Sequence, residues 1–302
     1  MNILVTGCYG YIGKFLCSFL ADKKYKVYGI DRIKNPSINF AQKLENYSCT
    51  DLCSNKLPFL QTNNIDVVVH LAGEAKLESK KSEYNANNTA ATENLIHSLN
   101  SNIKKIIFIS SNKIEDGSNY GKSKLACEYI LIKAAKEKNI SFTILRSAAV
   151  YGIGMRSNIL RWLRRAYKNE INAIPESKSE LAMVGLNDLA KIILACCDNE
   201  STDNKIYQVT DGVTYSINKL EIEARKLSQN LSGVGYYPRW LLYIGSKIGD
   251  IAKIFGLSMS LNSRSYNMFF KNTVVHNTAI FDDLCCRPEQ NYFDEMPKLL
   301  KD

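Results

Sequence analysis

Residues 2–16, NILVTGCYGYIGKFL, decide the fold that we predict for this chain. The stretch opens with an apolar run at residues 3–5, which is typical of a strand buried on both faces. Three glycines follow at intervals of three, and apolar residues continue beyond them at helical spacing. A strand, a glycine turn and a helix in this order bring backbone N–H groups and a helix N-terminus toward a pyrophosphate. The stretch predicts the first βα unit of a dinucleotide-binding domain; a glycine turn that binds nothing is the alternative.

An acidic side chain ends the next apolar run. Asp31 follows the run at residues 27–30, close to the interval expected for a carboxylate that binds the adenosine ribose. Such a carboxylate accepts hydrogen bonds from the ribose hydroxyls of NAD and repels the 2′-phosphate of NADP. Arg32 comes directly after it and could pair with that phosphate instead. The pattern favours NAD and leaves NADP open.

Composition sets limits on the class of protein. A chain of 302 residues with 45% hydrophobic residues can bury a large core, as one large domain or two unequal ones. The nine cysteines follow no metal-ligand spacing, so we expect reduced thiols and no metal site. Met1 leads straight into the first predicted strand, and no apolar run approaches the roughly 20 residues of a membrane helix. We therefore expect a cytoplasmic protein without stable membrane insertion.

The formal net charge of +9 comes from scattered lysines and arginines. No nucleic-acid-binding motif accompanies them. A solvated basic surface that favours an anionic small-molecule substrate is the interpretation we prefer, and we expect no nucleic-acid partner.

Strands and helices alternate along the first half of the chain. Apolar runs predict strands over 65–70, 105–110 and 141–145, with a helix over 85–100 between the first two. This repeated βα pattern predicts an α/β fold, a Rossmann-type doubly wound parallel sheet. We expect a dinucleotide-binding domain over 1–152, to which later segments contribute, and a smaller interleaved substrate lobe over 153–302.

Three helices are predicted in the second half. They cover 158–168, 187–197 with Asn187 at the N-cap, and 239–255. The last is amphipathic, and we expect its apolar side to pack within the lobe. Its Trp, Tyr and Arg residues would also suit a membrane-surface anchor, which is the alternative.

Candidate catalytic groups follow the strand over 105–110. Ser110 and Ser111 come at its carboxyl end, the edge of a parallel sheet where ligands bind. Tyr120 and Lys124 are four residues apart at the start of a helix and therefore share one face. The lysine charge can then lower the pKa of the phenol toward working pH. An exposed Tyr and Lys on an amphipathic helix are the alternative from spacing alone.

As an ordered set, these motifs resemble the extended short-chain dehydrogenase/reductase superfamily, in its NAD-dependent nucleotide-sugar epimerase/dehydratase branch. The resemblance runs the whole length of the chain. The matching segments are TGxxGxxG at 6–13, the acidic Asp31, the adenine-side Asp51, HLA at 70–72, the helix-start Asn88, Ser110–Ser111, YxxxK at 120–124 and LRPxxVYGPG at 145–154. The last segment departs from the family pattern, because Ser147 and Ile153 replace its two prolines.

The resemblance implies roles for these residues. Tyr120 would be the acid/base on the sugar oxygen, Ser111 would hydrogen-bond that oxygen, and Lys124 would hold the nicotinamide ribose. The implied cofactor-binding residues are Gly7, Tyr9, Gly10, Tyr11, Ile12, Gly13, Asp31, Arg32, Asp51, Leu52, Leu71, Ala72, Gly73, Asn88, Ser110, Tyr120 and Lys124. The implied substrate-binding residues are Ser111, Asn112, Tyr120, Asn158 and Arg161, with Arg164 as a further source of charge.

The resemblance also narrows the reaction. Asn112 and Lys113 stand where the family's dehydratases carry an acidic residue followed by Glu or Lys, which argues against dehydration because an amide is not an acid. The short loop at 114–119 resembles certain sugar 4-ketoreductases. Residues 155–160 and 237–242 resemble epimerases and reductases of UDP-N-acetylated hexoses in surface-polysaccharide synthesis.

These cues lead us to expect NAD-dependent 4-epimerisation of a UDP-hexose or UDP-N-acetylhexosamine through a 4-keto intermediate. An NAD(P)H-dependent 4-keto-sugar-nucleotide reductase is the alternative, and a non-catalytic dinucleotide-binding sensor is the third hypothesis. The expected partner is a UDP-sugar, and a homodimer is left open.

Overall fold

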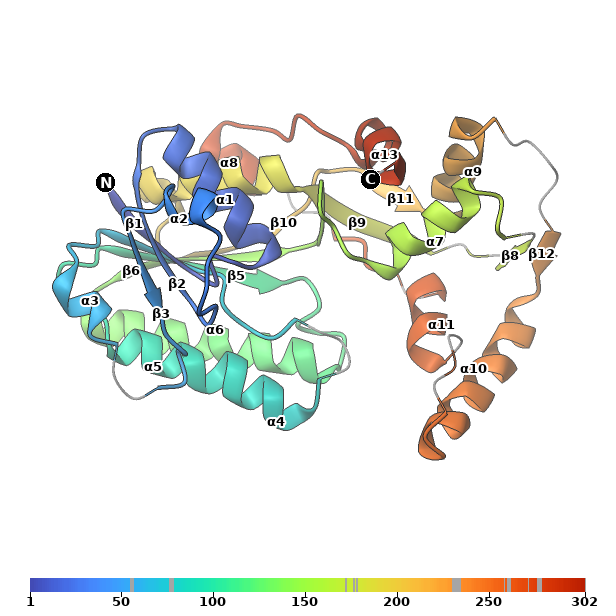
Figure 1. Ribbon diagram of the computed structural model, residues 1–302, viewed down its shortest axis with the longest axis horizontal. Coiled ribbons are helices and arrows are strands. Elements are labelled where there is room, and N and C mark those ends of the chain that lie inside the picture. Colours follow the sequence, from blue (N-terminus) through green and yellow to red (C-terminus); the bar gives the residue numbers. More distant parts are fainter. Residues whose placement is uncertain are drawn as a thin grey trace. The chain divides into compact units, whose positions relative to one another are not determined.

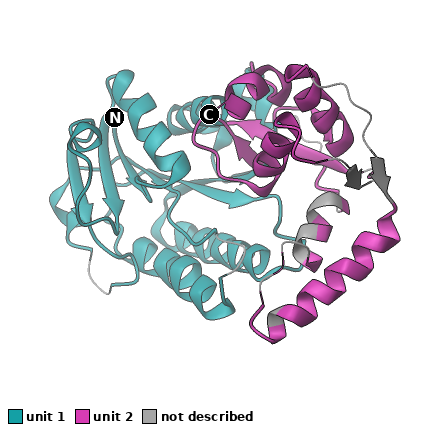
Figure 2. Ribbon diagram, turned by 45° about the vertical axis from the view of Figure 1, so that its right-hand side comes forward, with its two compact units in different colours: residues 1–148, 186–210, 276–287 teal, residues 149–185, 211–275, 288–302 magenta. Residues whose placement is uncertain are grey.

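The structure, a computed structural model, describes residues 1–54, 57–75, 79–171, 173–175, 177, 179–229, 235–257, 259, 262–270, 272–275 and 279–301. The chain divides into two compact units (Figure 2). Unit 1 comprises residues 1–148, 186–210 and 276–287, and unit 2 comprises 149–185, 211–275 and 288–302.

A seven-stranded parallel sheet forms the centre of unit 1 (Figure 1). Its strands are β1 (Asn2–Thr6), β2 (Lys26–Asp31), β3 (Asn46–Cys49), β4 (Val67–His70), β5 (Lys105–Ser111), β6 (Ser141–Ser147) and β10 (Lys205–Val209). They are ordered β10-β6-β5-β4-β1-β2-β3, and every neighbouring pair is parallel. The order reverses beside β1, so the doubly wound Rossmann-type sheet predicted from the βα alternation is confirmed.

Helices cover both faces of this sheet, because the strands are apolar on both sides. The helices α1 (Tyr11–Asp22) and α8 (Leu186–Asp198) lie on one face, and α5 (Ala91–His97) and α6 (Asn119–Lys138) lie on the other (Figure 1). Leu4, Val68 and Ile106 from the strands meet Leu95 and Leu131 from α5 and α6 in the core of that second face. The shorter elements of unit 1 are α2 (Ile38–Ala41), α3 (Phe59–Thr62), α4 (Lys81–Tyr84), the 3-10 turn at Glu200–Thr202 and α12 (Ala279–Leu284).

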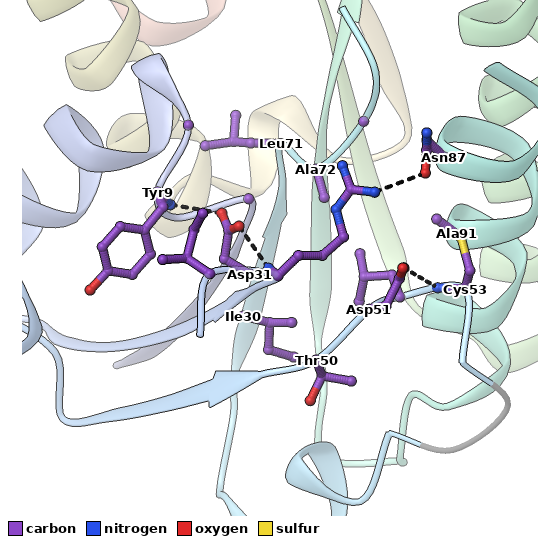
Figure 3. Close-up of a pocket in the computed structure, with 16 residues that line it drawn as sticks. Tyr9, Ile30, Asp31, Thr50, Asp51, Cys53, Leu71, Ala72, Asn87 and Ala91 are labelled. Atoms are coloured by element: carbon purple, nitrogen blue, oxygen red, sulfur yellow. Dashed lines mark hydrogen bonds between the residues drawn. The ribbon is translucent and has the colours of Figure 1, made fainter. Parts of the chain in front are cut away.

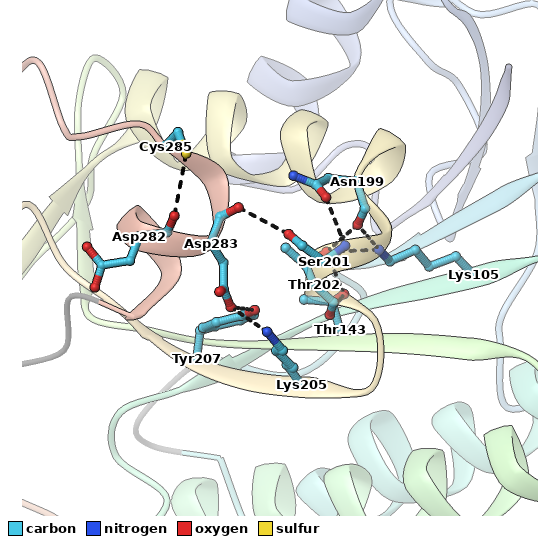
Figure 4. Close-up of polar contacts among 10 residues, drawn as sticks. All are labelled: Lys105, Thr143, Asn199, Ser201, Thr202, Lys205, Tyr207, Asp282, Asp283 and Cys285. Atoms are coloured by element: carbon cyan, nitrogen blue, oxygen red, sulfur yellow. Dashed lines mark hydrogen bonds and ion pairs between the residues drawn. The ribbon is translucent and has the colours of Figure 1, made fainter.

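A buried polar cluster fastens the later segments of unit 1 to the sheet (Figure 4). The Lys105 ammonium, on β5, donates to Thr202 Oγ1 at 2.9 Å and pairs with the Asp203 carboxylate at 2.5 Å. On β10, Tyr207 donates to the Asp283 carboxylate of α12. These contacts explain why residues distant in sequence belong to unit 1.

Unit 2 is built around small sheets and five helices among its described residues. The strands β7 (Ala149–Tyr151), β9 (Glu180–Gly185) and β11 (Thr214–Ser216) form one sheet, and β8 (Ala173–Pro175) pairs with β12 (Gly235–Tyr237). The helices are α7 (Asn158–Tyr167), α9 (Ile217–Leu227), α10 (Arg239–Ile254), α11 (Ser263–Phe270) and α13 (Tyr292–Lys301). Tyr151, Tyr215 and Tyr292 are fully buried, and the first two donate to the Asp211 carboxylate.

Three expectations about helices are corrected. The helix expected over 85–100 begins as a π-helix, Asn85–Ala90, and continues as α5 only to His97. Asn187 is not an N-cap, because α8 already begins at Leu186. The apolar side of α10 is exposed rather than packed. Within the described ranges, no helix combines the length and apolar character needed to cross a membrane.

Candidate active site

In the glycine turn between β1 and α1, backbone segments approach one another closely. Gly7 has a left-handed φ of +69°, and its N–H donates to the Ile30 carbonyl at 2.8 Å. Gly10 donates to the Gly7 carbonyl at 2.9 Å and stands at the N-cap of α1. A Cβ built on Gly13 would lie 2.2 Å from the Gly7 carbonyl oxygen. The turn therefore needs glycine at positions 7 and 13 for packing, and it presents the N-terminus of α1 at the carboxyl edge of the sheet.

A pocket opens beside this turn (Figure 3). Its polar wall is the Asp31 carboxylate, which accepts hydrogen bonds from the backbone N–H groups of Tyr9 at 2.9 Å and Arg32 at 2.7 Å. The Arg32 guanidinium donates to the Asn87 side-chain oxygen at 3.1 Å (Figure 3). Asp51 accepts from the Cys53 N–H at 2.9 Å. The acidic residue at the end of β2 and its basic neighbour thus both line one cavity.

The structure brings most of the predicted cofactor-binding residues to this pocket. Gly7, Tyr9, Gly10, Asp31, Arg32, Asp51, Leu52, Leu71, Ala72 and Gly73 line it. Tyr11, Ile12 and Gly13 lie in the first turn of α1. Our sequence reasoning missed Ile30, Ile33, Thr50, Cys53, Asn87 and Ala91. Asn87 could have been found from its polar side chain next to the predicted Asn88.

Ser111 and Tyr120 are brought together at the end of β5. Ser111 is the last residue of that strand, and Tyr120 lies in the first turn of α6, where Ser118 caps the helix by accepting the Gly121 N–H. Burial raises the pKa of Tyr120 to about 12, while its hydrogen bond with Ser111 opposes that rise. The ring of the buried Tyr84, which sequence reasoning also missed, lies 6.0 Å from the Tyr120 ring. Burial thus favours the protonated phenol, and the Ser111 hydrogen bond favours the phenolate.

Lys124 is one turn further along α6 and is buried. Its ammonium donates to the Ile109 carbonyl at 2.9 Å and lies 4.7 Å from the centre of the Phe108 ring. Burial lowers the pKa of Lys124. We had expected this lysine to lower the pKa of Tyr120; in the structure burial instead raises it, and Ser111 is the group that opposes the rise.

The amide of Asn88, in the π-helix, ties three segments of the site together. Its oxygen accepts the Glu74 N–H at 2.5 Å, and its nitrogen donates to Ser123 Oγ at 2.8 Å. Ser123 in turn donates to the Tyr120 carbonyl at 2.8 Å. Asn88 thus fixes the loop after β4 against the start of α6. π-helical turns occur often at functional sites.

Ser110 does not face the same way as Ser111. Its hydroxyl donates to the Glu128 carboxylate at 2.5 Å, and Arg146 binds that carboxylate with an N–O distance of 2.7 Å. Successive residues on a strand point to opposite faces of the sheet, so two adjacent serines cannot both face the ligand edge. These contacts bind the Ser110 hydroxyl to the Glu128–Arg146 ion pair, and its contact with the cofactor stays a prediction.

The predicted substrate-binding residues fall in both units. Asn112 directly follows β5, and its N–H donates to the Ser147 carbonyl at 3.0 Å. Asn158 and Arg161 lie on α7 of unit 2, where Arg161 donates to the Asn158 side-chain oxygen at 2.9 Å. Arg164 instead donates to the Leu299 carbonyl at 2.8 Å and so fixes α13, which accounts for its charge without a substrate.

His70 is a buried neutral side chain below the site. Its Nδ1 lies 2.7 Å from Thr6 Oγ1, and its Nε2 lies 3.0 Å from Thr92 Oγ1. Burial, together with the Lys124 charge, lowers the pKa of His70 to about 3. These contacts join β1, β4 and α5 beneath the pocket.

We expect His70 to make stability depend on pH. Its pKa is lower in the folded chain than the ordinary 6.5, so the unfolded chain binds one more proton between those values. The stabilisation is complete above the ordinary value and is lost as the pH falls toward 3, by up to about 1.4 kcal/mol per pH unit. Urea unfolding at about pH 7 and about pH 5 should show a smaller difference for His70→Asn than for the parent. His97→Gln, at an exposed histidine, should match the parent; equal pH dependence in all three would contradict this account.

Residues 3–210 match the family described as the NAD dependent epimerase/dehydratase family, and the chain belongs to that family. It is an NAD-dependent enzyme of the epimerase/oxidoreductase type, and its cofactor is NAD.

Two curated relatives and one solved structure illustrate the similarity. UDP-glucose 4-epimerase of Vibrio cholerae is 29% identical over 240 residues, which cover 70% of this chain and 71% of that protein. UDP-2-acetamido-2,6-beta-L-arabino-hexul-4-ose reductase of Pseudomonas aeruginosa is 26% identical over 226 residues. The match covers 73% of this chain and 56% of that protein. The structure of UDP-glucuronic acid 4-epimerase from Bacillus cereus with UDP-glucuronic acid and NAD has a TM-score of 0.76, with 22% identity and coverage of 100% of this chain and 99% of that one.

Proposed function

We propose that this enzyme interconverts the C4 epimers of a UDP-hexose or a UDP-N-acetylhexosamine through a 4-keto intermediate. The observation that carries the proposal is the buried Ser111–Tyr120 hydrogen bond, which lies in the same unit as the pocket beside the glycine turn. The similarity to a UDP-glucose 4-epimerase over 70% of the chain supports it.

The pocket fits the adenosine half of NAD. The glycine turn presents the N-terminus of α1 beside the pocket, and Asp31 offers a carboxylate to a ribose. Arg32 lines the same cavity beside that carboxylate. We assign Tyr11 and Ile12 to the pyrophosphate through their backbone N–H groups at the start of α1.

Tyr120 is the group that moves the proton. NAD bound in this pocket would supply the hydride acceptor and donor for the sugar C4. Tyr120 takes the proton of the C4 hydroxyl as the C4–H bond breaks and returns it when the carbonyl is reduced. The phenolate of Tyr120 is the base in this proposal, and the Ser111 hydrogen bond lowers the pKa of Tyr120 against the rise that burial causes. Ser111 also hydrogen-bonds the sugar oxygen.

Unit 2 is the substrate lobe in this proposal. Arg161 and Asn158 meet on one face of α7, where a guanidinium and an amide can bind the diphosphate of a UDP-sugar. The division we propose is therefore NAD in unit 1 and the nucleotide sugar on unit 2.

A 4-keto-sugar-nucleotide reductase is the second candidate, favoured by one specific observation. The loop 114–119 forms a compact turn, in which Ser118 donates its N–H to the Asp116 carboxylate at 2.8 Å and Gly117 has a φ of +78°. A short turn covers a sugar poorly, and an epimerase must retain its keto intermediate. The similarity to a reductase is consistent with that alternative.

Separation of sugar epimers decides between the two. Purified protein is incubated with UDP-galactose, or with UDP-N-acetylglucosamine, and catalytic NAD. We expect interconversion of epimers with no net formation of NADH. If NAD(P)H is oxidised only when a 4-keto sugar nucleotide is supplied, the protein is a reductase; NAD binding without turnover of either substrate would identify a sensor.

A further inference from the structure

The apolar side of α10 faces solvent along the whole helix. The α10 apolar face consists of Trp240, Leu241, Ile244, Ile248, Ile251, Ile254 and Phe255, each between 44% and 81% exposed. At 100° per residue, the first five of these and Phe255 fall within one stripe about a third of the helix circumference wide. Scattered single apolar residues on a surface are ordinary, but a continuous apolar face marks an interaction site.

The opposite side of α10 is the one that the fold buries. Ser246 is fully buried and donates to the Tyr243 carbonyl at 2.7 Å, and Gly249 is also buried. Arg239 donates to the Tyr266 hydroxyl of α11 at 2.8 Å, and the Tyr243 and Tyr266 rings are 5.6 Å apart. Contacts through Arg239 and Tyr243 thus hold α10 against the neighbouring α11 (Figure 1), so the large apolar residues of the face are not needed for that contact.

The stretch of sequence that contains α10 is basic. Residues 235–275 contain five basic residues and one acidic residue: Arg239, Lys247, Lys253, Arg264, Lys271 and Asp250. The Asp250 carboxylate accepts the Ser263 N–H at the start of α11, at 3.1 Å. Lys247 is exposed, with its ammonium 5.3 Å from the centre of the Tyr243 ring at the margin of the face. The one acidic group therefore serves the fold, while Lys247 stands at the margin of the apolar face.

We propose that the α10 apolar face binds the surface of a bilayer that contains anionic lipids. An amphipathic helix with Trp and Phe on its apolar side and basic residues at the border lies in the membrane plane, roughly 5–10 Å deep. Its 16 residues are fewer than the roughly 20 needed to span a bilayer, so binding is peripheral and reversible. A second copy of the chain fits less well, because a two-fold contact would bring the same basic stretch of sequence, with Lys247 at the margin of the face, against itself.

Co-sedimentation with vesicles tests this proposal. The full chain is mixed with vesicles of phosphatidylcholine alone and of phosphatidylcholine with phosphatidylglycerol. We expect it to pellet with the anionic vesicles and to be released by salt. The double variant Ile244→Glu/Ile251→Glu should bind at least about tenfold more weakly, because two apolar contacts are lost and two negative charges are added.

The control is Ile222→Glu on α9 of the same unit, where the isoleucine is 43% exposed and outside the face. It should bind like the parent, and thermal unfolding should show that both variants are folded. A parent chain that stays in the supernatant, or a double variant that pellets equally, overturns the proposal. So does light scattering that shows a parent dimer, converted to a monomer by the double variant, with no vesicle binding.

Discussion

Tyr120→Phe is expected to lower turnover by at least about a hundredfold while NAD affinity stays nearly unchanged, as for a lost general acid/base. Phenylalanine keeps the ring in its buried position beside Tyr84 and removes only the hydroxyl that hydrogen-bonds Ser111. The change therefore separates proton transfer from packing. Turnover would be measured with the nucleotide sugar that the epimer assay identifies, and NAD affinity by calorimetry.

Tyr84→Phe is the matched control, because it removes a second buried tyrosine hydroxyl close to the same ring. Its effect on turnover should be much smaller. If Tyr120→Phe turns over at nearly the parent rate, Tyr120 is not the acid/base. If both variants lose activity equally, the loss reflects packing around the two rings rather than proton transfer.

The parts of the fold that sequence reasoning predicted correctly are those set by local pattern. A parallel strand buried on both faces is a continuous apolar run, so β1, β4 and β5 could be located without knowing their neighbours. The glycine turn is recognisable because its backbone approaches exclude a Cβ at fixed positions in the sequence. The position of Asp31 and Arg32 could also be predicted, because the apolar run of β2 ends at Asp31.

The features that could not be predicted depend on which element, remote in sequence, packs against a residue. The periodicity of α10 shows which side is apolar, and only the structure shows that Ser246 and Gly249 lie on the side that packs. The i, i+4 spacing places Lys124 near Tyr120, but the Ile109 carbonyl that holds its ammonium belongs to a strand remote in sequence. Similarly, the partner of Ser110 is a carboxylate on α6.

Gly13→Ala is expected to destabilise unit 1 strongly, by at least about 3 kcal/mol, at the upper end of the range for overpacking. Glycine is less favourable than alanine in a helix interior by roughly 0.5–1 kcal/mol, so helix propensity alone predicts the opposite sign. The close contacts of the added Cβ decide the sign of the change in stability here. The added Cβ would lie 2.2 Å from the Gly7 carbonyl oxygen and 2.8 Å from Cys8 Cα. Both are backbone atoms of the turn, which cannot move aside as a flexible side chain can.

Gly10→Ala separates packing of the turn from cofactor binding. Its Cβ would meet only the Gly7 carbonyl oxygen, at 3.1 Å, and Gly10 has an ordinary φ of −66°. We expect its free energy of unfolding to change by less than about 1 kcal/mol, within the range of mild substitutions. We expect its NAD affinity to fall, because the methyl group would stand at the helix N-terminus that we assign to the pyrophosphate. Urea unfolding and calorimetry with NAD measure the two effects.

A Gly13→Ala protein as stable as the parent would show that the turn relaxes around the methyl group. Unchanged NAD affinity in Gly10→Ala would remove the glycine turn from the cofactor site.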